Sequence, residues 1–203
     1  ADPTHAVRDT LRLQGIVGRS PALATLLGQV ALVAPLDVSV LLTGDSGTGK
    51  NQLARAIHDN GPRASGPFVE LNCATLPEAL VESELFGALP GAHSTPTRRV
   101  EGKVAAAEHG TLFLDEISDL TLPAQAKLLQ LLQSKQYFPL AGTRPLSADI
   151  RLTAATNTDL LAGVHAHRFR EDLFYRLQVL PLRVPSLAER RDDIRELAAH
   201  FCA

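Results

Sequence analysis

The chain has 203 residues, a length that fits one folded domain with a short extension. Hydrophobic residues make up 45% and charged residues 21%, which excludes a disordered tail and a coiled coil. The net charge of −2 argues against a dedicated nucleic-acid-binding domain, and no apolar run is long enough to span a membrane. Residues 1–10 contain no apolar signal segment, so we expect a cytoplasmic protein with no membrane partner. Cys73 and Cys202 are too few for a disulfide framework, and we expect both to be reduced thiols.

The hydrophobic pattern predicts strands that alternate with helices. Ser20 followed by a proline predicts a capped helix over residues 21–34, and the apolar run 38–43 predicts a strand buried on both faces. The remaining predicted elements are helices at 51–60, 77–86, 123–134, 168–178 and 192–202 and strands at 68–72, 111–115, 150–155 and 179–184. This alternation predicts a three-layer α/β fold in which helices flank a parallel sheet and ligands bind beyond the carboxyl ends of the strands.

A glycine-rich segment between the first predicted strand and the next helix matches the pattern GxxxxGK. Its backbone N–H groups could wrap a phosphate, the helix adds its positive N-terminal end, and the lysine adds a charge. The alternative is a glycine-rich turn that binds nothing. Position 51 is Asn instead of the usual Ser or Thr, so the hydroxyl that would bind Mg²⁺ is missing. The candidate cofactor-binding residues of this segment are Gly44, Asp45, Ser46, Gly47, Thr48, Gly49, Lys50 and Asn51.

A pair of carboxylates stands at the end of the apolar strand predicted at 111–115. Asp115 could hold Mg²⁺ through a water molecule, and Glu116 could polarise the attacking water. Taken alone, the pair is equally well explained as the acidic first turn of the next helix. Asn157, after the strand predicted at 150–155, could orient the water or sense a terminal phosphate. For Arg170 and Arg176, six residues apart, spacing alone favours a solvated helix face with local acidic partners.

From about residue 16 to 201 the chain resembles the central AAA+ ATPase domain of the bacterial enhancer-binding proteins, the sigma-54 activators. The matching blocks are GDSGTGK, ELNCATLPEALVESELFG, HGTLFLDEISDL, QAKLLQLLQ, DIRLTAATN, FREDLFYRL and ERRDDI. The resemblance implies a P-loop NTPase that forms a hexameric ring, binds ATP with Mg²⁺ between subunits and uses hydrolysis to remodel a complex of RNA polymerase with sigma-54.

The resemblance also implies roles for individual residues. Asn72 would restrain Glu116 until the γ-phosphate is sensed, and Asn157 would be the sensor. Arg170 and Arg176 would reach into the site of a neighbouring subunit. The adenine pocket would be lined by Ile16, Val17 and Gly18.

The loop that contacts sigma-54 departs from the family pattern. Members carry the motif GAFTGA, which falls here on Gly91, Ala92, His93, Ser94, Thr95 and Pro96. Thr95 in place of a glycine removes φ freedom, and the proline after it stiffens the loop. One reading is a working sigma-54 activator. The alternative is a nucleotide-binding oligomerisation module that acts with sigma-70 polymerase or as a DNA-bound assembly, and a third is another AAA+ remodeller.

We expect residues 1–15 to be an N-terminal linker and residues 16–203 the AAA+ α/β core, with an inserted loop at 87–99. The resemblance implies that a helical lid, a sensory domain of a two-component system and a DNA-binding domain lie outside this chain. Hexamer formation and turnover without the lid are expected to be weak.

Overall fold

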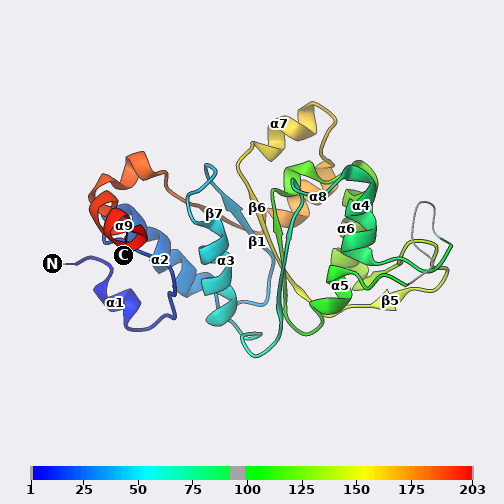
Figure 1. Ribbon diagram of the computed structural model, residues 1–203, viewed down its shortest axis with the longest axis horizontal. Coiled ribbons are helices and arrows are strands. Elements are labelled where there is room, and N and C mark those ends of the chain that lie inside the picture. Colours follow the sequence, from blue (N-terminus) through cyan, green and yellow to red (C-terminus); the bar gives the residue numbers. More distant parts are fainter. Residues whose placement is uncertain (1, 92–98, 203) are drawn as a thin grey trace.

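The computed structural model describes residues 2–91 and 99–202, which fold around one parallel sheet (Figure 1). The sheet has five strands in the order β2-β3-β6-β1-β7, and every neighbouring pair is parallel. Its strands are β1 (Val40–Thr43), β2 (Phe68–Asn72), β3 (Thr111–Asp115), β6 (Arg151–Thr156) and β7 (Leu180–Arg183). The predicted sheet is therefore confirmed, and β2 and β3 have the predicted bounds.

Helices cover both faces of the sheet and give three layers (Figure 1). One face packs against α2 (Pro21–Val33) and α3 (Lys50–Asp59), and η2 (Leu187–Asp193) and α9 (Ile194–Phe201) lie beside α2. On the other face lie α4 (Glu78–Phe86), α5 (Lys103–Ala106), α6 (Leu122–Ser134) and α8 (Glu171–Leu177). The short elements are α1 (His5–Arg8), η1 (Ile117–Asp119), α7 (Leu160–His165) and the antiparallel hairpin of β4 (Gln136–Tyr137) and β5 (Leu146–Ser147).

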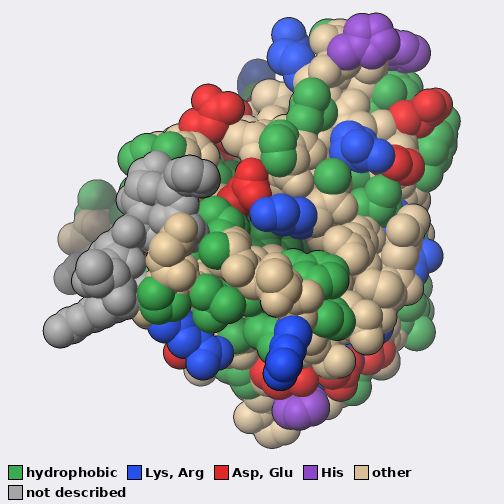
Figure 2. All heavy atoms as spheres, turned by 90° about the vertical axis from the view of Figure 1, so that its right-hand side faces the viewer, with side chains coloured by type: hydrophobic (Ala, Val, Ile, Leu, Met, Phe, Trp, Pro, Cys, Tyr) green, Lys and Arg blue, Asp and Glu red, His purple; other side chains and the backbone are tan. Residues whose placement is uncertain are grey.

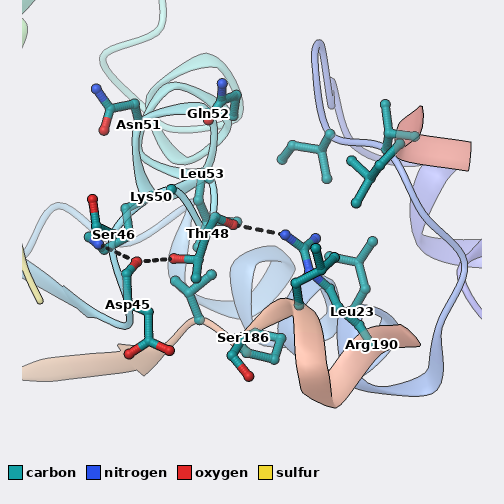
Figure 3. Close-up of a pocket in the computed structure, with 18 of the residues that line it drawn as sticks. Leu23, Asp45, Ser46, Thr48, Lys50, Asn51, Gln52, Leu53, Ser186 and Arg190 are labelled. Atoms are coloured by element: carbon teal, nitrogen blue, oxygen red, sulfur yellow. Dashed lines mark hydrogen bonds between the residues drawn. The ribbon is translucent and has the colours of Figure 1, made fainter. Parts of the chain in front are cut away.

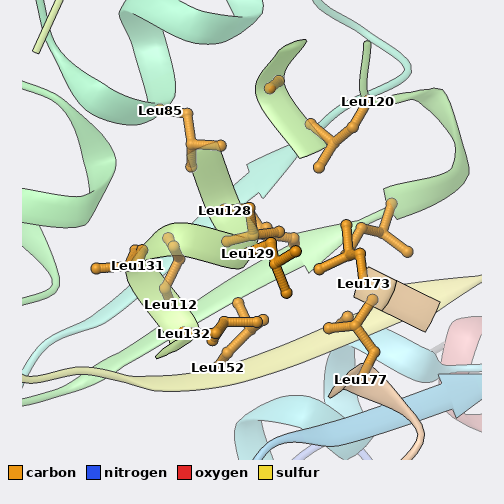
Figure 4. Packing of buried hydrophobic residues seen from close by; sticks show 14 of the residues in the cluster. Leu85, Leu112, Leu120, Leu128, Leu129, Leu131, Leu132, Leu152, Leu173 and Leu177 are labelled. Atoms are coloured by element: carbon orange, nitrogen blue, oxygen red, sulfur yellow. The ribbon is translucent and has the colours of Figure 1, made fainter. Parts of the chain in front are cut away.

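Alternation along the strands divides the core into two clusters. In β3, Leu112 and Leu114 point to the α6 side, whereas Phe113 packs in the cluster of α2 and α3. Leucines of α6 and α8 fill the first cluster against β3 and β6 (Figure 4). Because Asp115 follows the same alternation as Phe113, its carboxylate lies on the α3 face of the sheet, where the glycine-rich segment begins.

Polar caps fix where the long helices start. The Ser20 hydroxyl accepts a hydrogen bond from the Leu23 N–H at 3.3 Å, as expected for the predicted cap of α2. Thr121 caps α6 in the same way, accepting from the Ala124 N–H at 3.2 Å. The described helices include none that is long and apolar enough to cross a membrane.

The predicted helix 168–178 is wrong at its start, because α8 begins at Glu171. The N–H groups of Arg168 and Phe169 both donate to the Gly163 carbonyl, which continues the turn after α7. The Arg170 N–H donates to the side chain of Gln125 at 2.8 Å, so Arg170 is the N-cap residue of α8. Arg170 therefore precedes α8, and of the two arginines only Arg176 lies within the helix.

Other predicted bounds shift by smaller amounts. β1 begins at Val40 and not at residue 38, where its pairing with β6 and β7 starts. β6 lies one residue later than predicted, and the helix predicted at 192–202 is a 3₁₀ segment up to Asp193 followed by α9. The elements α1, α5, α7 and the β4–β5 hairpin have two to six residues each, too few for a hydrophobic period to appear.

Candidate functional site

The glycine-rich segment lies where the motif requires it, between β1 and α3. Gly47 and Gly49 have φ of 75° and 96°, in the left-handed region that glycine adopts without a Cβ clash. The Thr48 hydroxyl donates to the Asp45 carbonyl at 2.8 Å and closes the loop on itself. The loop therefore has the backbone shape of a phosphate cradle at the N-terminus of a ten-residue helix.

Lys50 is folded into this loop. Its ammonium donates to the carbonyls of Gly44 and Asp45, both at 2.8 Å, and the residue is only 5% exposed. A buried ammonium needs such partners, since an unpaired charge away from water is costly. The cation is thus held at the loop, where it can exchange a carbonyl for a phosphate oxygen.

The two carboxylates at the end of β3 have different surroundings. Asp115 is buried, and its oxygens accept from the Glu116 N–H at 3.0 Å and from the Asn72 amide at 3.3 Å. Glu116 has φ of 51° and ψ of 54°, and its side chain accepts from the Asn157 N–H at 3.1 Å. A left-handed conformation outside glycine is uncommon and clusters at functional sites.

One role implied by the resemblance differs from this geometry. Asn72 contacts Asp115, its register partner on the neighbouring strand, and not Glu116. The left-handed turn at Glu116 directs the carboxylate to the end of β6, where the backbone of Asn157 holds it. In this structure the hydrogen bond that restrains the Glu116 carboxylate therefore comes from Asn157, the residue that the resemblance implies to be the sensor.

A cavity of about 950 Å³ connects the loop with the acidic strand end. Ile16 and Val17 line it, as expected, and Gly18 does not. The opposite wall comes from η2 and α9, including Leu197 and Phe201. Five apolar positions of η2 and α9 that line this opening are exposed: Leu187, Ala188, Ile194, Ala198 and Phe201.

Two residues of η2 hold this wall in place, and sequence reasoning missed both. The buried carboxylate of Asp193 accepts from the N–H groups of Arg19 and Ser20 at 2.6 and 2.8 Å and from the Ser20 hydroxyl at 2.7 Å. A Cβ at Gly18 would overlap this carboxylate, which explains the glycine there. Arg190 donates to the Thr48 carbonyl at 3.0 Å (Figure 3). The block ERRDDI contained both residues, but no motif assigns them this task.

The N-terminal segment is part of the same wall. Arg8 of α1 donates to the carbonyls of Ile16 and Gly18 at 3.1 and 2.6 Å. Residues predicted as a linker thus contact the segment that lines the cavity.

Oxygen donors at the loop fit Mg²⁺. Asp115 and Asn51 both line the cavity, and Mg²⁺ bound with a nucleotide takes one or two protein oxygens, with phosphates and waters completing its shell. Residues 2–91 and 99–202 contain no group of three or more His, Cys, Asp or Glu side chains placed to hold a metal alone. The donor set therefore suits a cation that arrives with phosphate.

The two expected arginine fingers lie outside the cavity of their own chain. Arg170 is exposed and paired with Asp172 at 2.8 Å, and Arg176 is exposed and donates to the Leu132 carbonyl at 3.1 Å. The pairing with Asp172 lowers the pKa of that carboxyl. Neither arginine is among the residues that line this cavity.

The predicted partner loop is described only at Gly91, because Ala92, His93, Ser94, Thr95 and Pro96 lie outside the described residues. Its two flanks are joined to each other, since Ala88 exchanges backbone hydrogen bonds with Val100 at 3.0 and 2.8 Å. Figure 2 views this side of the molecule, where hydrophobic side chains lie among lysines and arginines.

Both cysteines are free thiols, and burial raises the pKa of Cys73 to about 12.

Known proteins resemble this chain in sequence and in structure. The family described as the Sigma-54 interaction domain matches residues 16–183. The transcriptional regulatory protein ZraR of Escherichia coli (strain K12) is 51% identical over 187 residues, which cover 92% of this chain and 42% of ZraR. The DNA-binding transcriptional regulator NtrC of Rhizobium meliloti (strain 1021) is 47% identical over 186 residues, which cover 92% of this chain and 38% of NtrC.

The crystal structure of NtrX from Brucella abortus in complex with ATP has a TM-score of 0.86 and 38% identity, covering 97% of this chain and 42% of that chain. The chain thus spans about two fifths of the length of the curated relatives it matches. The family match includes the phosphate loop, the acidic end of β3 and most of the sheet. On this evidence the chain belongs to the sigma-54 interaction domain family, with the three-layer P-loop fold of AAA+ ATPases.

Proposed function

We propose that this domain binds ATP with Mg²⁺ and hydrolyses it to ADP and phosphate. The observation that carries the proposal is the placement of the Lys50 loop and the Asp115–Glu116 pair on one cavity of about 950 Å³. The N–H groups of the loop and Lys50 would hold the phosphates. Ile16, Val17 and the apolar side of α9 would enclose the base.

Each acidic residue has a separate task in this proposal. Asp115 would hold Mg²⁺ through water, and the metal would neutralise charge on the phosphate oxygens. Glu116 would accept a proton from the attacking water or orient it, while the Asn157 backbone keeps its carboxylate in place.

The test compares Lys50→Ala with Glu116→Gln. Lys50→Ala should lose nucleotide binding, whereas Glu116→Gln should bind nucleotide and lose turnover by at least about 100-fold. Binding is read from a fluorescent ATP analogue and turnover from phosphate release. Full turnover by Glu116→Gln would contradict the assignment.

We further propose that the working form is a ring of six subunits, as in the family arrangement, in which Arg170 and Arg176 reach a neighbour's nucleotide. Both arginines are exposed and neither lines the cavity of its own chain, which supports this proposal. The test mixes Arg170→Ala with Lys50→Ala chains. Activity should reappear in the mixture, because one interface combines an intact cavity with an intact arginine. If no ratio of the two variants restored ATPase activity, the proposal that Arg170 serves the nucleotide site of a neighbouring subunit would be refuted.

The proposed output is remodelling of a polymerase complex that contains sigma-54. The family match supports this client. The sequence GAHSTP at residues 91–96 favours the alternative, a module that acts with sigma-70 polymerase or as a DNA-bound assembly through a domain outside this chain. The longer protein should be tested for binding to purified sigma-54 with ADP and aluminium fluoride. Stable capture of sigma-54 supports the remodelling of a sigma-54 polymerase complex. ATP turnover without capture supports the alternative module that acts without sigma-54.

A further inference from the structure

Asn51 occupies the position at which P-loop proteins usually carry a Mg²⁺-binding hydroxyl. It is the second residue of α3 and lines the cavity. Its amide nitrogen donates to the Glu70 carboxylate on β2 at 2.5 Å. A carboxylate accepts hydrogen bonds and does not donate them when ionised, so this contact fixes which end of the amide faces Glu70.

The amide oxygen of Asn51 is therefore directed away from Glu70. In Figure 3 the oxygen lies on the side of the amide nearer to Ser46, and the nitrogen points away from the loop. The hydrogen bond to Glu70, made between two exposed side chains, distinguishes the two orientations of the Asn51 amide. The oxygen is presented toward the loop that would hold the phosphates.

The cation that follows Asn51 on α3 contacts an aromatic ring of β2. Arg55 follows Asn51 by one turn of α3, and its guanidinium lies over the Phe68 ring at 4.1 Å from the ring centre. Within residues 2–91 and 99–202, the hydrogen bond from Asn51 is the one that the structure gives for the Glu70 carboxylate.

Glu70 also belongs to the row of polar residues that leads to Asp115. Glu70 and Asn72 are two residues apart on β2 and share a face of the sheet. Asn72 contacts Asp115 across the β2–β3 pairing. The loop helix and the acidic strand end are thus connected by side chains of one edge strand.

We propose that the amide oxygen of Asn51 is a direct ligand of the Mg²⁺ that accompanies the nucleotide, and that Glu70 is the positioning residue that orients it. This rests on the proposed nucleotide-binding function. An amide oxygen is a hard neutral donor of the kind that Mg²⁺ accepts, so it replaces the missing hydroxyl without adding charge. Glu70 acts as an outer-shell partner, which for metal ligands sets orientation and affinity.

The experiment measures the dissociation constant of a fluorescent ADP analogue in EDTA and across a Mg²⁺ titration, using the whole 203-residue chain. Asn51→Ala and Glu70→Ala should bind as the parent does in EDTA. Both variants should need about tenfold more Mg²⁺ than the parent to reach half of the maximal gain in affinity for the ADP analogue. Glu70→Gln, which keeps an acceptor for the Asn51 amide, should stay within about twofold of the parent. Glu78→Ala, an exposed carboxylate on α4, is the matched control and should change nothing.

Direct ligation is tested by changing the metal preference. In a Cys202→Ser background, Asn51→Cys places a thiol where the amide was, and a thiolate prefers soft ions to Mg²⁺. The concentration of Cd²⁺ that gives half-maximal tightening should fall by about tenfold relative to the Asn51 parent. Replacing a residue that has only a structural role would not change the preference between Mg²⁺ and Cd²⁺.

Two results separate the possible failures. An unchanged Mg²⁺ dependence in Asn51→Ala and Glu70→Ala, with no gain for Cd²⁺ in Asn51→Cys, overturns the inference while nucleotide binding stands. No nucleotide binding by the parent in EDTA or in Mg²⁺ refutes the proposed function itself.

Discussion

Asp193 joins the C-terminal wall of the cavity to the N-terminal segment, and replacing it with alanine should destabilise the domain. The carboxylate is 1% exposed and accepts three hydrogen bonds, of 2.6, 2.8 and 2.7 Å, from Arg19 and Ser20. Asp193→Ala leaves two N–H groups and one hydroxyl without this partner in a buried site. Hydrogen bonds to a charged group contribute about 1.5–3 kcal/mol each, and water entering the space replaces part of the loss.

The expected cost of Asp193→Ala is about 3–4 kcal/mol in the free energy of unfolding. For a domain of this size it lowers Tm by about 6–16 °C. Asp193→Asn keeps one acceptor oxygen for the two N–H groups and should cost only about 1–2 kcal/mol. The assay is urea unfolding followed by circular dichroism.

Asp192→Ala is the matched control, since this neighbour has the same charge and is exposed. It should change the free energy of unfolding by less than about 0.5 kcal/mol. Nucleotide affinity should fall in Asp193→Ala as well, because the Ile16–Val17 side of the cavity loses its connection to η2. Equal stability of the two alanine variants would refute the reasoning.

Three further predictions concern the same domain. The Arg183 side chain, with the N–H and hydroxyl of Ser186, lowers the pKa of Glu189 to about 2, so the stabilisation is present above the unfolded pKa near 4.5 and disappears as pH falls toward 2. Glu189→Gln should therefore differ from the parent in urea midpoint at pH 6 and converge with it near pH 2.5; a constant difference would contradict this. A disulfide-exchange reagent should modify Cys202 in seconds and Cys73 only after unfolding, since the Cys73 thiol is buried with a pKa raised to about 12; two fast thiols would disprove it. Arg190→Ala should weaken nucleotide binding about fivefold through loss of its bond to the Thr48 carbonyl, with Arg191→Ala as the exposed control; identical affinities in both would argue against it.

The sheet and its main helices could be predicted because each signal was local. The apolar run 111–114 is followed by the carboxylates Asp115 and Glu116, and Ser20-Pro21 marks a helix start by hydrogen-bond chemistry. The glycine-rich loop could be placed for the same reason, as its residues are contiguous between a strand and a helix.

The parts that sequence reasoning missed depend on contacts between distant segments. Asp193 binds Arg19 and Ser20 across more than 170 positions, and no spacing rule links them. The start of α8 is set by Gln125 and Gly163, which lie outside the helix, so the periodic pattern extended it too far. The partner of Asn72 follows from strand register, which the sequence alone left open.

The central claim is that the Lys50 loop binds the phosphates of ATP. The most direct measurement is isothermal titration of ATP, with Mg²⁺ present, into the parent chain and into Lys50→Ala, with circular dichroism to show that both are folded. Lys50→Ala removes two charge-assisted contacts that the ammonium would make with the phosphates, so ATP binding should weaken by about 100-fold or more. Equal affinity in two folded proteins would contradict the account.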